Sequence, residues 1–259
     1  MANTALVTGA SAGIGRAFAA LHAARGGDLI ITARRGDALE TLRTELEAKH
    51  GVTVTCIALD LGAPDGARDL IAAVEAGGHR VDVLINNAGF GGHGLFVSRD
   101  IAKDLAMIDL NVKALVELTH HFAKAMAARG GGRILNVSST ASYMPGPLQA
   151  TYFATKAFVS SFSQALAEEL TGTGVTVTAL EPGYVTTEFA AVADLEGTPL
   201  TRRGATPEAV AKVGYDAMMA GKLRVINDKL LGFQLRWVIP FLPRRATLRL
   251  VRKLQEKAS

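Results

Sequence analysis

Near its N-terminus the chain reads Thr4-Ala-Leu-Val-Thr-Gly-Ala-Ser-Ala-Gly-Ile-Gly15, a short apolar strand that runs straight into a glycine-rich turn. A stretch of helical character follows, Arg16 to Arg25, and Gly26-Gly27 ends it. Strand, glycine turn and helix in this order are the context that a dinucleotide-binding fingerprint requires. The stretch therefore predicts the first unit of an α/β fold with a parallel sheet.

Each glycine of this turn has its own physical role. Gly9 allows the tight turn, Gly13 lets the backbone approach a pyrophosphate, and Gly15 lets the helix pack closely on the strand. The helix N-terminus offers free N–H groups to phosphate oxygens, and Ser11 and Ile14 lie in the same loop. We expect all of these residues to contact a dinucleotide; the alternative is a tight turn without a ligand.

The next apolar run, Asp28 to Ala33, ends in Arg34-Arg35. In dinucleotide-binding folds an acid at this place holds the ribose of NAD, whereas an arginine accommodates the additional phosphate of NADP. Guanidinium groups suit a phosphate because each offers a planar fork of donors. Asp37 is a competing acid, but it lies further into the following helix. We expect NADP(H), with NAD as the alternative and a solvated arginine pair as the reading without a ligand.

Apolar strands continue to alternate with helices along the rest of the chain. Further strands are predicted at Val52–Leu59, Val81–Ile85, Arg133–Val137 and Val175–Leu180. Helices are predicted at Asp37–Lys49, Asp65–Glu75, Ile101–Met126 with a kink, Tyr152–Leu170, and from Thr206-Pro207-Glu208 onward. This alternation predicts a Rossmann-like, doubly wound parallel sheet of about seven strands with helices on both faces.

Polar residues and glycines follow the predicted strands at the point where each strand ends. In such sheets ligands gather at the carboxyl ends of the strands. The residues at those ends are Gly9, Arg34, Asp60, Asn86, Ser139 and Pro182. Their common position predicts a single site along one edge of the sheet.

The bulk properties restrict the class of protein. With 259 residues and 49% apolar composition, the chain is long enough for one sizeable core. The net charge of +4 is too small to indicate a nucleic-acid partner. Cys56 is the single cysteine, which is typical of a reducing compartment. We expect a cytoplasmic protein, since we find neither a signal peptide nor an apolar run of about 18 residues.

The stretch Ala150-Thr-Tyr-Phe-Ala-Thr-Lys156 places Tyr152 and Lys156 one helical turn apart. A tyrosine hydroxyl has a reference pKa of about 10 and is a poor acid–base group near neutrality. A neighbouring ammonium favours the phenolate, and lowering the pKa by about three units requires roughly 4 kcal/mol. We therefore expect Lys156 to lower the pKa of Tyr152 for proton transfer.

Taken together, these motifs resemble the short-chain dehydrogenase/reductase family in its single-domain branch, over roughly Ala2 to Glu188. The motifs that carry the resemblance are Thr8-Gly-Ala-Ser-Ala-Gly13-Ile-Gly15, Asp60-Leu61, Asn86-Asn-Ala-Gly89, Asn111, Ser139, Tyr152 with Lys156, and Pro182-Gly-Tyr-Val-Thr-Thr187. The glycine spacing differs from that of the extended branch. The resemblance implies one dinucleotide-binding catalytic domain over 1–259.

The resemblance also implies catalytic roles. Tyr152 would be the general acid/base, and Lys156 would lower its pKa and hydrogen-bond the nicotinamide ribose. Ser139 would hold the substrate oxygen, with Ser138 as the alternative hydroxyl. Asn111 would support a water relay from the lysine to solvent; from the helical pattern alone it is an ordinary surface or capping residue.

For the cofactor, the resemblance implies contacts along the strand ends. Asp60 and Leu61 would contact the adenine, and Asn87, Ala88 and Gly89 would line the cofactor. Val185 and Thr187 would bind the carboxamide and phosphate region, with Pro182 and Gly183 in the same loop. The hydride would leave the B face of the nicotinamide. Without the resemblance, the same residues are ordinary strand-end and turn residues.

A substrate lid is expected at about 188–206. The candidate pocket residues are mostly apolar, and they are Phe90, Phe96, Tyr143, Met144, Pro145, Leu148, Tyr184, Phe189 and Val192. They favour an apolar substrate, such as an acyl chain, a steroid or an aromatic ketone. The alternative for each of them is ordinary core or rim packing.

The C-terminal tail, at about 233–259, is basic and amphipathic. We expect a helix with an apolar stripe of Leu248, Val251 and Leu254, flanked by Arg245, Arg249 and Arg252. Such a helix can lie on an anionic membrane surface, which would be a weak peripheral contact. Subunit packing and a solvated final helix are the alternatives.

The sequence thus predicts a cytosolic NADP(H)-dependent oxidoreductase that interconverts a ketone or aldehyde and an alcohol. By the resemblance it forms a homodimer or homotetramer through the helices of Asn111 and Tyr152. We expect no nucleic acid and no metal, because the adjacent His120 and His121 point apart on a helix without a carboxylate or cysteine cluster. The rival interpretations are a non-catalytic dinucleotide sensor and an interaction protein that uses the basic tail.

Overall fold

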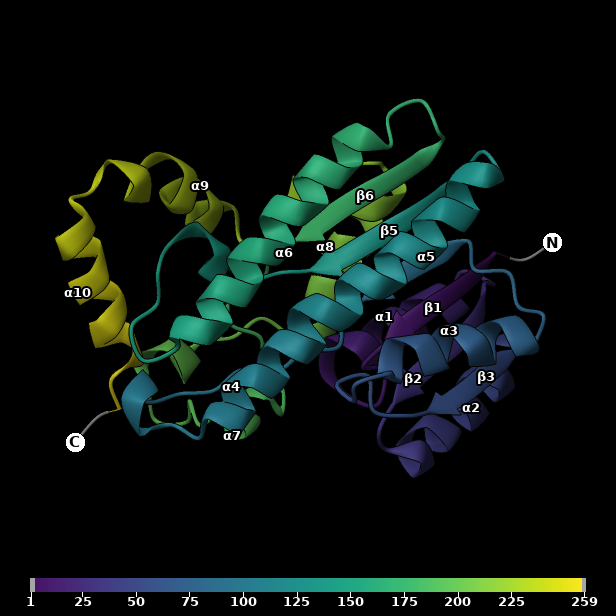
Figure 1. Ribbon diagram of the computed structural model, residues 1–259, viewed down its shortest axis with the longest axis horizontal. Helices are drawn as coiled ribbons and strands as arrows, with labels where there is room; N and C mark the ends of the chain where they lie inside the picture. The colour runs from purple at the N-terminus through teal and green to yellow at the C-terminus, as the bar shows by residue number, and fades with distance from the viewer. Residues whose placement is uncertain (1–2, 258–259) are drawn as a thin grey trace.

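The strands of the chain form one parallel sheet in the computed structural model, which describes residues 3–257 and only the backbone at position 202. The strands are β1 (Thr4–Thr8), β2 (Asp28–Ala33), β3 (Val54–Ala58), β4 (Val83–Asn86), β5 (Gly132–Val137), β6 (Val175–Leu180) and β7 (Arg224–Val225). Their order is β3-β2-β1-β4-β5-β6-β7, and every pairing is parallel (Figure 1). The chain changes direction across the sheet between β1 and β4, the place where such folds bind ligands.

Helices cover both faces of this sheet. The helices are α1 (Gly13–Ala23), α2 (Gly36–His50), α3 (Gly66–Ala76), α4 (Ile101–Ile108), α5 (Leu115–Ala128), α6 (Ala150–Glu169), α7 (Phe189–Val192), α8 (Pro207–Met219), α9 (Lys229–Trp237) and α10 (Arg244–Gln255). Short 3-10 turns are η1 (Phe96–Ser98), η3 (Thr140–Tyr143), η4 (Pro199–Arg202) and η5 (Ile239–Phe241). The expected doubly wound sheet with about seven strands is confirmed.

The alternation of side chains along each strand produces two cores. In β1, Val7 faces a cluster with Phe18 of α1, Leu42 of α2 and Tyr215 of α8. The neighbouring Leu6 faces a second cluster, which is formed by α3, α5 and part of α6. Helices therefore cover both faces of the sheet, and Asn86 of β4 and Asn136 of β5 are buried in a hydrogen-bonded network with α5 and α6.

The long helix expected at Ile101–Met126 is interrupted. A π-helical segment, η2 (Asp109–Ala114), separates α4 from α5 and contains Asn111. Single π turns inside α-helices are frequent at functional sites. The expected helix is thus interrupted by this segment, and the place of the interruption coincides with a predicted site residue.

The C-terminal segment folds back on the protein, and α10 buries one of its faces there. The side chains of α10 that are buried are Thr247, Val251 and Gln255, which are spaced by four residues, whereas Leu254 is 40% exposed. Three residues rotate a helix by about 60° less than a full turn. Leu254 lies two such steps after Leu248 and is therefore turned away from the buried face. Of the expected stripe, Leu248 is half-buried, Val251 is buried and Leu254 is exposed, so the three side chains differ in their surroundings.

Candidate active site

The glycine turn and the segment after β4 are joined through Thr8 at the end of β1. The Thr8 hydroxyl accepts hydrogen bonds from the N–H groups of Asn87 and Ala88, both at 2.9 Å. The side-chain amide of Asn87 donates to the Thr8 carbonyl at 2.9 Å. Asn87 and Ala88 thus lie beside Gly9, and Thr8, which the sequence analysis quoted in the glycine motif without a role, joins the two segments.

The glycines of the turn occupy positions that no other residue fits. Gly9 has a φ of +68°, and a Cβ on it would lie 2.9 Å from the Asn87 amide nitrogen. A Cβ on Gly15 would lie 2.3 Å from the Gly9 carbonyl oxygen. Helix α1 begins at Gly13 without a side-chain cap at Ala12 and without an acid in its first turn. Its N-terminal N–H donors therefore suit the pyrophosphate of a dinucleotide.

Arg34 and Arg35 lie directly before the N-terminus of α2, and both are exposed. The Arg35 guanidinium donates to the Ser11 hydroxyl at 3.4 and 3.2 Å and pairs with the Glu188 carboxylate at 3.0 Å. An exposed ion pair of this kind contributes little and is readily exchanged for another anion. The Arg35 guanidinium, the Ser11 hydroxyl and a helix N-terminus thus form a site whose chemistry fits a phosphate, and the exposed Arg34 precedes it in the chain.

Of the other residues expected near the adenine and the phosphates, Leu61 and Ile14 pack in the core and Asp60 is exposed. Leu61 is buried against α3, and Ile14 packs on the core beneath α1. Asp60 is exposed, and one of its carboxylate oxygens accepts the Gly62 N–H at 2.9 Å. Asp60 therefore stabilises the turn after β3 and keeps its second oxygen at the edge of the sheet.

Ser139, Tyr152 and Lys156 meet at the carboxyl end of β5. The Lys156 ammonium donates to the Val137 carbonyl at 2.9 Å and lies 5.9 Å from the centre of the Tyr152 ring. The Ser139 hydroxyl accepts the Ala141 N–H at 3.1 Å and donates to the Pro182 carbonyl at 3.4 Å, and it lowers the pKa of Tyr152. The Ser138 hydroxyl instead donates to the Lys156 carbonyl at 2.7 Å and is buried. This arrangement favours Ser139 over Ser138 as the hydroxyl that meets a substrate.

The acid–base properties of the pair differ from the expectation. Burial raises the pKa of Tyr152 to about 12, and the hydrogen bond with Ser139 opposes this rise. Burial lowers the pKa of Lys156 to about 8. The expectation that Lys156 lowers the tyrosine pKa is therefore wrong for this structure, because the ammonium is itself desolvated and its donor is directed at the Val137 carbonyl.

Asn111 connects the loop after β4 to helix α6. Its amide nitrogen donates to the Phe90 carbonyl at 2.9 Å and to the Thr155 hydroxyl at 3.2 Å, and its oxygen accepts the Phe90 N–H at 3.1 Å. A Cβ on Gly89 would lie 2.9 Å from the Asn111 oxygen and 3.5 Å from the Lys156 ammonium. The buried side chains of Asn111 and Lys156 therefore both approach Gly89. A side chain at position 89 would collide with the Asn111 oxygen, so only glycine fits there.

The loop after β6 closes the site from the other side. The Pro182 carbonyl accepts the Thr140 N–H at 2.9 Å, and the Gly183 N–H donates to Asn227 at 3.1 Å. Val185 pairs with the backbone of Ala205 in an isolated bridge. Thr187 accepts the Phe189 N–H at 3.2 Å, and a Cβ on Gly13 would lie 3.0 Å from its methyl group. The structure thus places Thr187 against the glycine turn, at Gly13.

A buried carboxylate that sequence reasoning missed stabilises this region. Glu181 is fully buried and pairs with the Arg224 guanidinium through two hydrogen bonds of 3.2 Å. It also accepts the hydroxyl protons of Tyr143 at 2.8 Å and of Ser160. Four elements meet at this carboxylate: β6, β7, η3 and α6. The only signal in the sequence is an isolated acid at the end of an apolar strand.

Two segments cover Tyr152. The Phe189 ring of the expected lid lies 5.4 Å from the Tyr152 ring, centre to centre. Val251 of α10 packs in a cluster with Phe153 and Ala141, against which Met144 and Tyr152 also pack. The expected lid at 188–206 and the C-terminal helix therefore both meet at the tyrosine.

Hydrogen bonds hold the tail in this place. The Gln149 amide donates to the Gln255 side chain at 2.6 Å, and His93 contacts the Gln255 carbonyl at 2.8 Å. Lys257 pairs with Asp194 of the lid segment at 2.6 Å. No pattern in the sequence predicted that residues so near the C-terminus would join the loops around α6.

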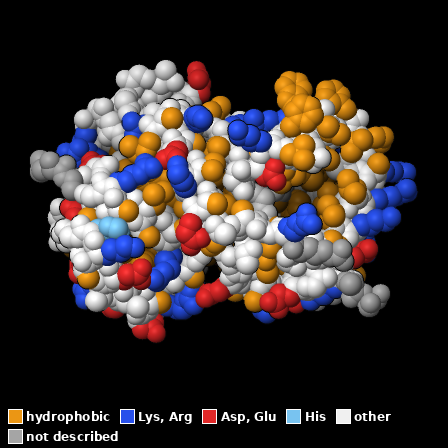
Figure 2. Space-filling view, turned by 180° about the vertical axis from the view of Figure 1, so that it is seen from behind, with side chains coloured by type: hydrophobic (Ala, Val, Ile, Leu, Met, Phe, Trp, Pro, Cys, Tyr) orange, Lys and Arg blue, Asp and Glu red, His pale blue; other side chains and the backbone are white. Residues whose placement is uncertain are grey.

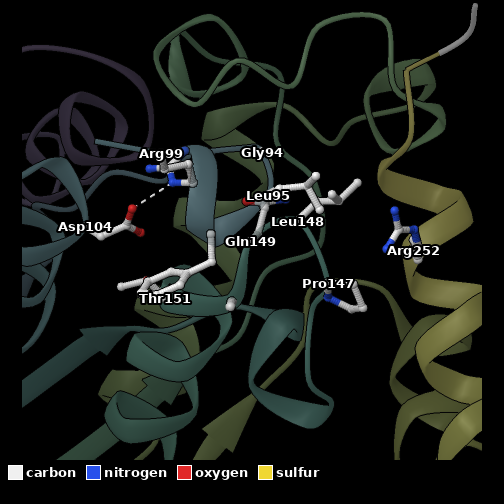
Figure 3. A pocket seen from close by; sticks show the side chains of 11 residues that line it. Gly94, Leu95, Arg99, Asp104, Pro147, Leu148, Gln149, Thr151 and Arg252 are labelled. Carbon is white, nitrogen blue, oxygen red and sulfur yellow. Dashed lines mark hydrogen bonds and ion pairs between the residues drawn. The ribbon is translucent and has the colours of Figure 1, made fainter. Parts of the chain in front are cut away.

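Two hollows lie beside segments that flank Tyr152 in the chain, one lined by Thr151 and the other by Phe153. One, of about 210 Å³, lies between segment 94–104, loop 147–151 and Arg252 of α10, with the Arg99–Asp104 ion pair at 2.8 Å in its wall (Figure 3). The other is an open groove of about 580 Å³ along loop 142–147, the outer face of α6 and Leu248.

The candidate pocket residues are distributed between these places. Phe96 and Leu148 line the first hollow, and Tyr143, Met144 and Pro145 line the second. Tyr184 packs with Phe189 in a small cluster of the lid, whereas Val192 is 63% exposed and outside both hollows. Phe90 is held through its backbone by Asn111.

Neither metal chemistry nor a membrane span is found among the described residues. Within 3–257, no group of three or more His, Cys, Asp or Glu side chains is placed to hold a metal ion. In the same part of the chain, no helix has both the length and the apolar character needed to cross a bilayer.

Comparison with known proteins gives consistent matches. The model of the short chain dehydrogenase family matches residues 3–196. A short chain dehydrogenase of Pseudocercospora fijiensis is 38% identical over 197 residues, which cover 75% of this chain and 63% of that protein. A sulfoacetaldehyde reductase of Chromohalobacter salexigens is 41% identical over 194 residues, which cover 74% of this chain and 76% of that protein.

Solved structures share the fold along nearly the whole chain. A 7β-hydroxysteroid dehydrogenase superposes with a TM-score of 0.86 at 26% identity, and 96% of each chain is covered. A short-chain dehydrogenase from Sphingobium yanoikuyae, in complex with NADPH, superposes with a TM-score of 0.82 at 31% identity, covering 99% of this chain and 98% of that one. With its parallel sheet, its glycine turn and these matches, the chain belongs to the short chain dehydrogenase family and is an oxidoreductase that acts on CH–OH groups.

Proposed function

We propose that the protein is a cytoplasmic NADP(H)-dependent oxidoreductase that interconverts an apolar ketone or aldehyde and its alcohol, with Tyr152 as the general acid/base. The observation that carries this proposal is the meeting of Ser139, Tyr152 and Lys156 beside Gly89. They lie at the sheet edge where the fold and the glycine turn suit a dinucleotide. A protein that only sensed the dinucleotide would not need this set.

The proton in the proposed reduction comes from Tyr152. With a pKa of about 12, its hydroxyl is protonated at neutral pH and is available to a substrate oxygen that is gaining negative charge. The Ser139 hydroxyl holds the same oxygen and lowers the pKa of Tyr152, which favours the phenolate that remains. Lys156 would hydrogen-bond the nicotinamide ribose. A bound nicotinamide cofactor supplies the hydride, or accepts it in the oxidation.

Asn111 has a positioning role in this proposal. It holds the Phe90 backbone and the Thr155 hydroxyl, and Thr155 directly precedes Lys156 on α6. The π-helical segment turns its amide toward the site. The proposed relay of protons from Lys156 to solvent would begin beside this amide.

The preference for NADP(H) rests on Arg34 and Arg35 at the N-terminus of α2. We expect Arg34→Asp to weaken NADPH binding by about tenfold to a hundredfold, because a charged hydrogen bond to phosphate contributes about 1.5–3 kcal/mol. NADH binding should stay unchanged or improve. The measurement is a fluorescence titration of each cofactor, with Arg43→Asp further along α2 as the charge-matched control. Equal loss of NADPH affinity in both variants would contradict the phosphate site.

The proposed apolar substrate follows from the side chains around Tyr152. The Tyr152 ring lies 5.4 Å from the Phe189 ring and 6.2 Å from the Phe153 ring, centre to centre, and it packs against the cluster of Ala141, Phe153 and Val251. Desolvation by such residues favours a bulky apolar carbonyl over a small polar one. The 7β-hydroxysteroid dehydrogenase with the same fold acts on substrates of this kind.

A panel of carbonyl compounds with NADPH tests this part. We expect kcat/KM for a bulky apolar ketone to exceed that for a short sulfonated or hydroxylated aldehyde by at least about tenfold, since each buried methylene contributes about 0.8 kcal/mol. The initial rate of NADPH oxidation is the readout. A short sulfonated aldehyde as the best substrate would contradict the apolar site and would favour the activity of the relative from Chromohalobacter salexigens.

We also propose that the protein is a homo-oligomer. Apolar side chains of α4 are exposed at Ile101 (57%), Leu105 (53%) and Ile108 (42%), and Phe158 of α6 is 42% exposed. These helices carry or flank the site, and contiguous apolar surface of this kind marks subunit contacts. The dimer or tetramer expected from the family would cover it.

A further inference from the structure

A second exposed apolar surface lies on α9 and η5, away from α4 and α6. It consists of Leu230, Phe233, Trp237, Val238, Phe241 and Leu242, which we name the tail patch. Phe241 is 79% exposed, Leu230 68% and Trp237 64%. The opposite face of α9 is already used, because Gly232 and Leu235 are buried against the protein. The outward residues therefore have no partner within the described part of the chain.

The tail patch is flanked by cations. Arg244, Arg245, Arg249 and Lys253 of α10 are exposed, and within residues 3–257 none of them forms an ion pair. The segment from 229 to 255 contains no Asp or Glu. Figure 2 shows hydrophobic side chains gathered at the end of the molecule that carries α9 and α10, with Lys and Arg side chains at their margin. The surface is thus both apolar and strongly positive.

The combination of exposed apolar side chains and cations favours one kind of binding partner over the others. Two copies that met face to face through the tail patch would bring the arginines of α10 toward one another, which is unfavourable. Duplex DNA would pair with the cations but would leave Trp237 and Phe241 in water. The headgroup region of an anionic bilayer satisfies both, because aromatic rings enter the interface and Lys or Arg side chains contact lipid phosphates.

We propose that the tail patch and the cations of α10 dock the protein on an anionic lipid surface. The buried face of α10, at Thr247, Val251 and Gln255, stays against the site, and its outer face is free for the bilayer. The bound orientation places the hollow lined by Arg252 near the membrane. An apolar substrate dissolved in the bilayer would then be close to Tyr152, a step that rests on the proposed function.

Trp237 is the single tryptophan of the chain and reports directly on this contact. We expect its emission to shift to shorter wavelength with phosphatidylcholine vesicles that contain about one third phosphatidylserine, and to stay unchanged with phosphatidylcholine alone. The variant R244S/R245S/R249S should bind the anionic vesicles roughly tenfold to a hundredfold more weakly. The variant K49S/R68S/K124S removes equal charge from α2, α3 and α5 and should bind as the unchanged protein does.

A second variant separates insertion from simple charge attraction. Phe241→Ser changes an exposed side chain, so folding is kept, and we expect about tenfold weaker vesicle binding.

The proposal is overturned if the emission of Trp237 does not shift, if both triple variants lose binding equally, or if Phe241→Ser binds unchanged. It is also overturned if duplex DNA shifts the emission and vesicles do not, or if Phe241→Ser dissociates an oligomer without altering vesicle binding. Vesicle binding requires no turnover, so failure of the proposed catalysis leaves this result readable.

Discussion

Replacing Tyr152 by Phe should lower kcat by about a thousandfold and leave NADPH affinity within about twofold. The variant removes only the hydroxyl that hydrogen-bonds Ser139. The ring keeps its contacts with Phe189, Phe153 and Met144, so the fold and the cover over the site are retained. Steady-state turnover of an apolar ketone and a cofactor titration on the same preparation measure both quantities.

The matched control is Tyr184→Phe, which removes a hydroxyl from the neighbouring lid cluster. It should change kcat by less than about threefold, because the hydroxyl of Tyr184 has no part in the proposed proton transfer. If Tyr152→Phe kept more than about a tenth of the turnover, another group would have to supply the proton. If it lost cofactor binding as well, the ring would be part of the cofactor site and not the acid.

Glu181→Ala should be the most destabilising single substitution near the site. Removing one partner of a buried, hydrogen-bonded ion pair costs about 3–5 kcal/mol, because the Arg224 guanidinium is left without its counter-charge. For a chain of this size such a loss lowers Tm by roughly ten degrees. Since Tyr143 and Ser160 also lose their acceptor, the loop that carries Ser139 should become mobile and turnover should fall.

Thermal and denaturant unfolding measure the expected loss. Glu188→Ala is the control, because this acid forms an exposed ion pair with Arg35 and should cost less than about 1 kcal/mol. The double variant E181L/R224M should recover part of the stability, since it replaces both charges by apolar groups. A cost for Glu181→Ala no larger than that of the control would show that the carboxylate does not hold β6, β7 and α6 together.

Much of the fold could be predicted from local pattern. The apolar runs predicted β1 to β6 within a few residues, because strands that are buried on both faces must be continuously apolar. β7 (Arg224–Val225) could not be located, because a two-residue strand carries no periodicity. The kink of the long helix was expected, but its form as a π-helical segment at Asn111 depends on contacts with Phe90 and Thr155.

For the site, too, some features could be predicted from the sequence and others could not. Glycines at strand ends and the Tyr152/Lys156 spacing have a local signature, so the sequence predicted where they lie. The pKa values of that pair depend on burial, which the folded chain as a whole produces, and the expected direction for Tyr152 was wrong. Glu181 was missed because its partners Tyr143, Ser160 and Arg224 are brought together only by the sheet. The contact of Gln255 with Gln149 and His93 has no local pattern either.

Whether the chain moves a hydride is decided by one assay, in which the unaltered protein is mixed with NADPH and a bulky apolar ketone. We predict that NADPH is consumed, that the alcohol forms in equal amount, and that NADH under the same conditions reacts more slowly. NADPH that binds but is not oxidised with any carbonyl of the panel would contradict the proposed function. It would favour a dinucleotide sensor built on the same sheet, with Ser139, Tyr152 and Lys156 serving only to bind the cofactor.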